Sequence, residues 1–311
     1  MKITLFNACV SAGLIEEYYK AIGSNAPVPN VLTSYFYADG NISRLLEMQK
    51  NGKIGQFYLD SGAFSFKNGE LVKNDFEAER FLDGYIGYLK LFGHKFDAHF
   101  TLDNNFKDPE HNLNYFLRIN SSLVNSEKKT VPVLHAEGKA MLEEFKLYAD
   151  MGCKHVAIGS NVKIKERKYW EEFQKIRAKK GIKIHLFGVI HEKDLSVLKM
   201  IMPDSCDSGK IFQVTKFGFL LYLKENPKTH TKSFDRIYIG GKETPPEKSL
   251  TFSQYIAKQE NEDFKQYLES INVDHGKMLD NSTLTHVINL HQVCLYEAYL
   301  NEAIFNSDKK E

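Results

Sequence analysis

The chain has 311 residues, of which 42% are hydrophobic and 26% charged, and its formal net charge is +1. This composition is typical of a folded globular protein and excludes a disordered or fibrous chain. The near-zero net charge excludes a general attraction to nucleic acid, so any such binding depends on a local patch. No stretch approaches the roughly 20 apolar residues of a membrane-spanning helix. We expect no membrane partner and a cytoplasmic location.

The apolar N-terminal run meets Glu16 and Glu17 too early to predict a signal peptide. Four cysteines are far apart and form no C-x-x-C pair, which predicts neither a disulfide framework nor a cysteine zinc site. They are Cys9, Cys153, Cys206 and Cys294. We expect reduced, mostly buried thiols, and neither a metal nor a cofactor.

Short apolar runs alternate with longer helical patterns along the first two thirds of the chain. The strand patterns are 3–7, 31–37, 56–60, 98–103, 131–135, 155–159, 182–189 and 205–207. The helical patterns between them are 14–23, 42–52, 75–93, 109–124, 141–152, 166–181 and 193–202. Nearly continuous apolar strands indicate parallel strands covered by helices. The pattern predicts an α/β fold, a TIM-like (β/α)8 barrel, with an open doubly wound sheet as the alternative.

The pattern changes after residue 215. A stretch rich in Lys, Pro, Thr and Gly predicts an irregular arm or a hairpin, and two helical segments follow at about 252–271 and 283–306. We therefore expect a barrel domain over 1–215 and, over 216–311, a lysine-bearing arm with C-terminal helices packed on the barrel.

Polar residues follow the strands in turn, where a barrel builds its active site. The stretch "YLDSGAFSF" ends an apolar run in Asp60, Ser61 and Gly62. Later strands end in Asp103, His135 with Glu137, Gly159, Gly188 and finally Asp207. A single Asp after a strand is most often a helix N-cap or turn residue, and a single His is as often structural. Their coincidence at successive strand ends favours a shared pocket, and paired carboxylates suit chemistry at a sugar anomeric carbon.

The chain resembles the tRNA-guanine transglycosylase superfamily, and most of all its shorter phage-type branch that inserts 7-deazaguanine bases into DNA. The resemblance covers about residues 55 to 210 and leaves both ends unaccounted for. It rests on six stretches in chain order: "LDSGAFS", "FTLDN", "PVLHAEG", "VAIGS", "HLFGVIHEKDL" and "DSCDSGK".

The resemblance implies a role for each matched residue. Asp207 is the expected nucleophile toward C1′ of the nucleotide sugar, and Asp60 the general acid and base. Asp103 is expected to accept hydrogen bonds from the guanine N1–H and exocyclic amine. His135 stands where the tRNA enzymes have glutamine. The other expected substrate-binding residues are Ser61, Gly62, Gly159, Phe187 and Gly188.

The tRNA enzymes of this superfamily carry a zinc site after the barrel, formed by three cysteines and a histidine, whereas this chain has only Cys294 in that region. The resemblance therefore implies DNA as the polymer and a 7-deazaguanine base as the co-substrate, in the host cytoplasm if the chain is phage-encoded. Because the target base must leave the duplex stack, we expect the segment 210–248 and the terminal helices to hold the DNA, with Lys210 and Lys216 as contacts. A homodimer is possible.

Basic residues also cluster elsewhere, although each cluster is most simply a solvated surface. The clusters are Lys163, Lys165, Arg167 and Lys168; Arg177, Lys179 and Lys180; and Lys210, Lys216, Lys224, Lys228 and Lys232. Three other functions stay open: the same exchange on tRNA, a catalytically silent barrel that binds nucleic acid or a partner, and a glycoside or nucleoside hydrolase. Fold alone does not decide among them.

Overall fold

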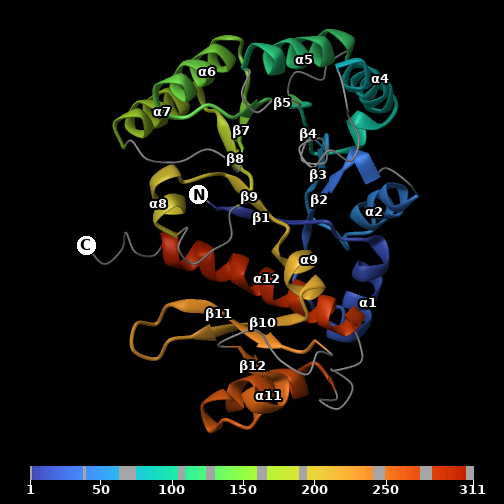
Figure 1. The fold of residues 1–311 in the computed structure, drawn as a ribbon, viewed down its shortest axis with the longest axis vertical. Coiled ribbons are helices and arrows are strands. Elements are labelled where there is room, and N and C mark those ends of the chain that lie inside the picture. The colour runs from blue at the N-terminus through green and yellow to red at the C-terminus, as the bar shows by residue number, and fades with distance from the viewer. Residues whose placement is uncertain are drawn as a thin grey trace.

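The computed structural model describes residues 2–37, 40–62, 75–103, 109–123, 130–159, 167–188, 195–240, 249–273 and 282–305. Among the sequence predictions, Asn104, Asn105, Ser160, Asn161, Val189, Lys163 and Lys165 lie outside these ranges. The chain forms an α/β barrel, with a smaller sheet and further helices on one side of it (Figure 1).

The main sheet has nine strands, all parallel, in the order β5-β4-β3-β2-β1-β9-β8-β7-β6. The strands are β1 Thr4–Ala8, β2 Asn30–Ser34, β3 Phe57–Asp60, β4 Ala98–Phe100, β5 Thr130–Val131, β6 Val133–Leu134, β7 His155–Ile158, β8 Lys183–Leu186 and β9 Ser205–Ser208. The described strands confirm the predicted alternation of strands and helices, including the weakly apolar segment at 205–207.

The two ends of this sheet, β5 and β6, are separated along the chain by Pro132 alone. Proline has no N–H and interrupts a strand ladder, so the single predicted strand at 131–135 is split in two. The Thr101 N–H donates to the Val131 carbonyl at 3.0 Å, and the Ala157 N–H donates to the Pro132 carbonyl at 2.8 Å. The sheet is thus a nearly closed parallel barrel, compatible with a TIM-like barrel and not with an open doubly wound sheet.

Helices surround the barrel. They are α1 Ala12–Ile22, α2 Asn41–Lys50, α4 Asp75–Phe92, α5 Pro109–Ser122, α6 Gly138–Asp150, α7 Arg167–Lys180, α8 Leu195–Ile201 and α9 Lys210–Lys216, with short 3-10 turns η1 Tyr35–Tyr37 and η2 Gly93–Lys95. Their buried faces join the outward strand residues in one large core. A separate cluster of inward residues fills the barrel, including Phe6, Tyr58, Phe100 and Ala157. The barrel interior is therefore packed, and a ligand site is expected at its rim.

After α9 the chain forms a small three-stranded sheet, β10 Phe219–Glu225, β11 Lys232–Tyr238 and β12 Leu250–Thr251. β10 and β11 are a regular antiparallel hairpin paired from Phe219 with Tyr238 to Glu225 with Lys232. Of the two expected forms, arm or hairpin, the described residues adopt the hairpin. Four helical segments complete this region: α10 Phe252–Ile256, η4 Gln259–Asn261, α11 Glu262–Ser270 and α12 Ser282–Phe305.

The 24-residue α12 lies between the barrel and the hairpin (Figure 1). Its residues Leu290 and Val293 pack into the barrel-side core, whereas Ile288 packs into a second core with β10 and α11. A helix covered on two sides carries apolar residues around most of its circumference. No helix of the described residues is long and apolar enough to cross a bilayer. The domain boundary at residue 215 stays a prediction.

Candidate functional site

Three carboxylates occupy the carboxyl ends of barrel strands, as the sequence predicts. Asp60 is the last residue of β3, Asp103 follows β4, and Asp207 lies in β9. Asp103 and Asp207 are buried and Asp60 is half-buried. The charges of Asp103 and Asp207 both act on Asp60. Three residues from distant parts of the chain thus form one acidic cluster at the barrel mouth.

The cluster changes the protonation of Asp60. Burial, with the neighbouring Asp103 and Asp207 carboxylates, raises the pKa of Asp60 to about 7, although the backbone N–H groups of Gly62 and Ser61 oppose the shift. The Gly62 N–H donates to Asp60 Oδ2 at 3.1 Å. A carboxyl group with a pKa near neutrality can both give and take a proton, as a general acid and base must.

Asp103 and His135 form a buried pair. His135 Nε2 contacts Asp103 Oδ2 directly. Burial raises the pKa of Asp103, and the hydrogen bond from His135 works against this rise. Packing also fixes the position of the His135 ring, because a Cβ atom on Gly159 would lie 2.5 Å from His135 Nδ1. The His135 ring therefore fills the space above Gly159, and the expected role of Gly159 in substrate binding stays a prediction.

The described contacts of the Asp207 carboxylate are made by one of its two oxygens. Its Oδ1 accepts from the Gly188 N–H at 2.9 Å and lies 3.5 Å from His185 Nε2. His185 is fully buried, and its Nδ1 shares a hydrogen bond with Ser205 Oγ at 2.9 Å. Phe187 stands beside it, with ring centroids 4.8 Å apart. Both of these described contacts engage Oδ1 of Asp207.

Gly62 is an expected substrate-binding residue whose backbone geometry requires glycine. Its φ is +94°, and a Cβ atom there would lie 2.7 Å from both Phe36 Cβ and Ser34 Oγ. The neighbouring Ser61 is fully buried. The turn after β3 is thus built to carry Asp60 into the mouth with little freedom.

Sequence reasoning missed three residues near these carboxylates. His185 on β8 lies two positions before Phe187, which directly follows the strand, and the two-residue period of extended chain predicts both on one side. Cys9 follows β1, has φ +64° and is exposed, and the charges of Asp207 and Asp60 act on it. Glu144 on α6 is buried beneath His135, and burial raises its pKa to about 7. Only His185 had a usable signal, namely its place in the strand.

The predicted basic contacts are placed in different ways. Lys210 is the first residue of α9, its side chain outside the described set, and Lys216 is an exposed residue in the last turn. Arg177 is not available to nucleic acid, because it is buried and donates to Asp204 Oδ2 at 2.7 Å. Lys180 pairs with Asp150.

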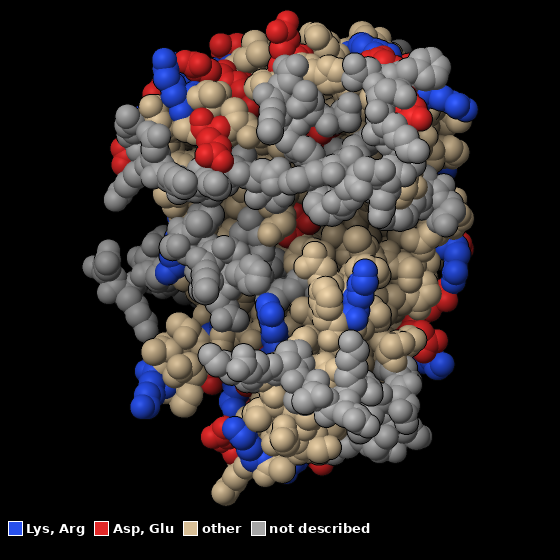
Figure 2. Space-filling view, viewed as in Figure 1, with Lys and Arg blue, Asp and Glu red and all other residues tan. Residues whose placement is uncertain are grey.

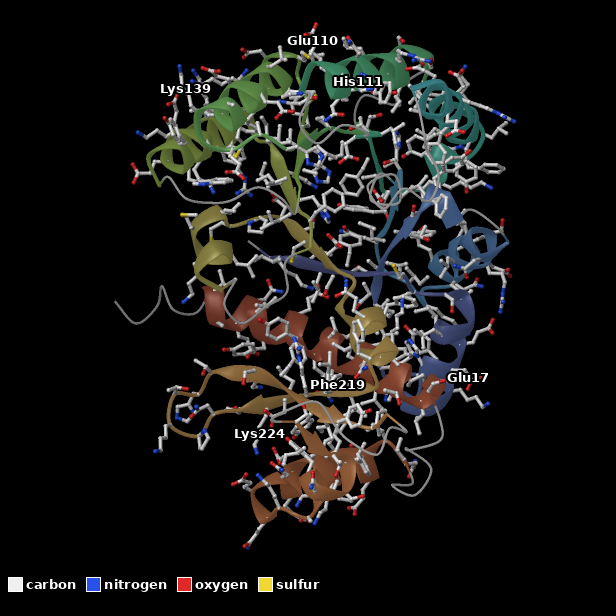
Figure 3. The ribbon with its side chains drawn as sticks, viewed as in Figure 1. Glu17, Glu110, His111, Lys139, Phe219 and Lys224 are labelled. Atoms are coloured by element: carbon white, nitrogen blue, oxygen red, sulfur yellow. The ribbon has the colours of Figure 1, made fainter. Side chains whose placement is uncertain are left out.

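The hairpin lysines are partly engaged as well. Lys224, labelled in Figure 3, donates to the Glu260 carbonyl at 2.9 Å and to Asn261. Lys228 in the turn is exposed. Figure 2 shows the Lys and Arg side chains of the described residues spread over this face rather than gathered in one patch. Contacts of DNA with Lys210 and Lys216 stay a prediction.

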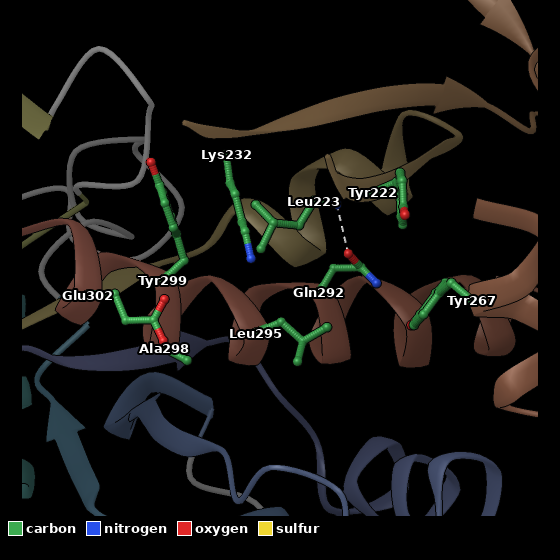
Figure 4. Close-up of a pocket in the computed structure, with 9 residues that line it drawn as sticks. All are labelled: Tyr222, Leu223, Lys232, Tyr267, Gln292, Leu295, Ala298, Tyr299 and Glu302. Atoms are coloured by element: carbon green, nitrogen blue, oxygen red, sulfur yellow. Dashed lines mark hydrogen bonds between the residues drawn. The ribbon is translucent and has the colours of Figure 1, made fainter. Parts of the chain in front are cut away.

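A cavity of about 290 Å³ lies away from the carboxylates, between the hairpin and α12 (Figure 4). Its lining is Tyr222, Leu223, Lys232, Tyr267, Gln292, Leu295, Ala298, Tyr299 and Glu302. Gln292 accepts the Leu223 N–H at 2.7 Å, and Lys232 Nζ lies 5.8 Å from the Tyr299 ring centroid. None of the predicted site residues lines this cavity.

Within the described ranges, no group of three or more His, Cys, Asp or Glu side chains is arranged to hold a metal ion. The fold and the mouth together define an α/β barrel with three carboxylates and two histidines at the carboxyl ends of its strands. Comparison of the chain with models of known protein families and with curated proteins finds no match.

Proposed function

We propose that this chain is a DNA-guanine transglycosylase, which exchanges guanine in DNA for a 7-deazaguanine base such as 7-cyano-7-deazaguanine. One observation carries the proposal: Asp60, Asp103 and Asp207 meet at the barrel mouth, and the pKa of Asp60 is about 7. The ordered resemblance of the strand-end motifs supports the same reaction. Proximity of a nucleophilic carboxylate and a proton-exchanging carboxyl suits glycosyl transfer through a covalent intermediate.

In the first half-reaction, Asp207 Oδ2 attacks C1′ of the deoxyribose while the C1′–N9 bond to guanine breaks. The electron pair of that bond passes to the base, and protonated Asp60 supplies a proton, so guanine leaves as a neutral molecule. The Gly188 N–H donates to Oδ1 of Asp207 and orients the carboxylate, and His185 Nε2 lies 3.5 Å from the same oxygen. The proposal therefore assigns the attack to the second oxygen, Oδ2.

The second half-reaction reverses these roles. The incoming 7-deazaguanine base loses its N9 proton to the Asp60 carboxylate, and N9 attacks C1′ as the bond to Asp207 breaks. Both carboxyl groups return to their starting states, so the exchange needs no cofactor. A pKa of about 7 leaves Asp60 divided between its acid and base forms near neutral pH, which suits both halves.

Base selection falls to the Asp103–His135 pair. The Asp103 carboxylate accepts hydrogen bonds from the N1–H and exocyclic amine of guanine, a pattern that adenine does not offer. His135 orients Asp103 through its Nε2 contact. Of the other expected substrate-binding residues, Phe187 is half-buried and Gly188 is exposed, whereas Ser61, Gly62 and Gly159 are buried.

The decisive experiment supplies purified protein with guanine-containing DNA, with tRNA, and with labelled 7-cyano-7-deazaguanine, and analyses nucleosides by mass spectrometry. We expect the new base in DNA, and an SDS-resistant protein–DNA adduct during turnover. Asp207→Asn should remove both, a loss of at least about 1,000-fold in rate. Asp83→Asn, on the exposed side of α4, is the matched control and should leave the rate unchanged.

The other outcomes separate the alternatives. Incorporation into tRNA alone would assign the chemistry to RNA, and release of free guanine without incorporation would identify a hydrolase. Retention of every nucleic-acid-dependent function in the double variant of Asp60 and Asp207 would identify a silent barrel.

A further inference from the structure

Two phenylalanine side chains, one on α9 and one directly after it, face solvent. Phe212 is 47% exposed and Phe217, which directly follows the helix, is 67% exposed. They are the aromatic members of the set of large exposed hydrophobic residues within the described ranges; the others are Val28, Leu91, Leu117, Leu147 and Met151. A single exposed apolar residue is ordinary. Two exposed aromatic rings close together in the chain indicate a surface that another molecule covers when the protein functions.

The two rings share a face with a lysine. Residues 212, 213, 216 and 217 are exposed, whereas Ile211, Val214 and Thr215 are buried against the protein. At about 100° per residue, Phe212 and Lys216 point within about 40° of each other. The outward face therefore consists of Phe212, Gln213, Lys216 and Phe217, and the whole segment from 210 to 217 contains no Asp or Glu. The ring of His286 on α12 lies 6.5 Å from that of Phe212 and extends this face.

The face begins beside the reacting carboxylate. β9, which carries Asp207, ends at Ser208, and α9 starts at Lys210 after a single glycine. Seven helical residues span about 10 Å, which is one to two nucleotide spacings of a nucleic-acid strand. A strand whose target nucleotide enters the mouth therefore passes within reach of Phe212 and Phe217.

We propose that the outward face of α9 is a stacking platform for unpaired bases of the DNA strand next to the target nucleotide, with Phe212 and Phe217 as the rings and Lys216 as the phosphate contact. The proposal rests on the proposed function for its choice of polymer. Aromatic rings interleaved with cations are the usual means of holding single strands without reading their sequence.

Charge favours a nucleic acid over a second copy of this chain. A second copy would meet the lysine-bearing face with its own identical lysine in a symmetric contact, whereas a phosphate backbone neutralises Lys216. Base flipping also creates the ligand that the platform needs, because removal of one base from a duplex leaves its neighbours and the opposite base unstacked.

The test measures binding of a short single-stranded DNA that contains 2-aminopurine next to the target guanine. Binding of wild-type protein should change the 2-aminopurine fluorescence through stacking. Phe217→Leu, which keeps apolar volume without a ring, should weaken binding about tenfold and remove the fluorescence change, while Phe217→Trp should restore both. Lys216→Ala should lower the slope of log affinity against log salt by about one. Leu91→Ala, at a residue 66% exposed on α4, is the matched control.

Equal affinity and equal fluorescence change for Phe217→Leu and wild type would overturn the inference. So would a wild-type dimer that Phe217→Leu converts to a monomer without any effect on DNA, since the platform would then be a contact between copies. Base exchange is measured separately on the same DNA. Stacking without exchange would refute the proposed function alone, and exchange with unaltered binding in Phe217→Leu would refute the platform alone.

Discussion

Polar side chains are buried in two regions of the molecule, the contact of α12 with β10 and the barrel mouth. The buried groups are neutral amides in the first region and carboxylates in the second. At α12, amide groups complete the hydrogen bonds of the free edge of β10: Asn289 accepts the Leu221 N–H at 2.6 Å, and Gln292 accepts the Leu223 N–H at 2.7 Å. At the mouth, Asp103 is buried and Asp60 is half-buried, and burial raises the pKa of both. At α12, uncharged amide groups join the helix to the sheet. At the mouth, carboxylates that repel one another are retained, which lowers the stability of the fold.

The difference distinguishes buried polar groups that stabilise the fold from buried polar groups that serve chemistry. A satisfied buried amide stabilises one arrangement of two elements. Carboxyl groups whose pKa is raised by burial, and in Asp60 also by neighbouring carboxylates, are typical of functional sites. Substitutions in the two regions should therefore change stability and activity in different ways.

The largest effect on stability is expected at Asn289. Its amide also donates to Thr215 Oγ1 at 2.9 Å and to the Phe219 carbonyl at 3.1 Å. Asn289→Ala leaves the buried Leu221 N–H without its partner, so the free energy of unfolding should fall by about 3 kcal/mol. Chemical denaturation measures this value. Gln266→Ala, on the exposed side of α11, should change it by less than about 0.5 kcal/mol; equal effects of the two substitutions would contradict the structural role of Asn289.

Substitution of Asp60 should change the free energy of unfolding in the opposite direction from Asn289→Ala. Its folded pKa of about 7 lies above the ordinary 3.8, so the folded state binds the proton more tightly. Stability from this group is therefore greatest at low pH and is lost as the pH rises from about 4 through 7. Asp60→Asn should raise the free energy of unfolding by about 2 kcal/mol at pH 8 and little at pH 4, while abolishing base exchange.

Denaturation curves at several pH values measure the effect of Asp60→Asn. Glu47→Gln, at an exposed site on α2, is the matched control. If Asp60→Asn were destabilising at pH 8, the contacts of the Asp60 carboxylate would outweigh the cost of burying it beside two other carboxylates.

The smallest effect is expected at Gly159, which supports the Asp103–His135 pair without taking part in it. A Cβ atom there would lie 2.5 Å from His135 Nδ1 and 2.6 Å from Cε1, so the ring must shift. Gly159→Ala should lower kcat/KM for exchange about tenfold, mainly through weaker recognition of the base. Gly87→Ala, where no heavy atom lies within 4 Å of the new Cβ, is the control and should leave kinetics unchanged. Unaltered kinetics in Gly159→Ala would show that the position of His135 does not limit the reaction.

The sequence by itself determined the local elements of this protein. Strand and helix periods predicted the alternation from β1 to α8, and the polar residues at strand ends identified Asp60, Asp103, His135 and Asp207, because parallel strands present their carboxyl ends on one edge. It also anticipated a hairpin as one form of the segment after residue 215. These features follow from residue spacing, which is a property of the chain alone.

Only the tertiary structure decided how those residues meet. It split the fifth strand at Pro132, buried Arg177 in an ion pair with Asp204, and filled the space above Gly159 with the His135 ring. It placed His185 against Asp207 and left Phe217 in solvent. Burial, charge and contact depend on which distant segments become neighbours, and a period of two or 3.6 residues carries no information about that.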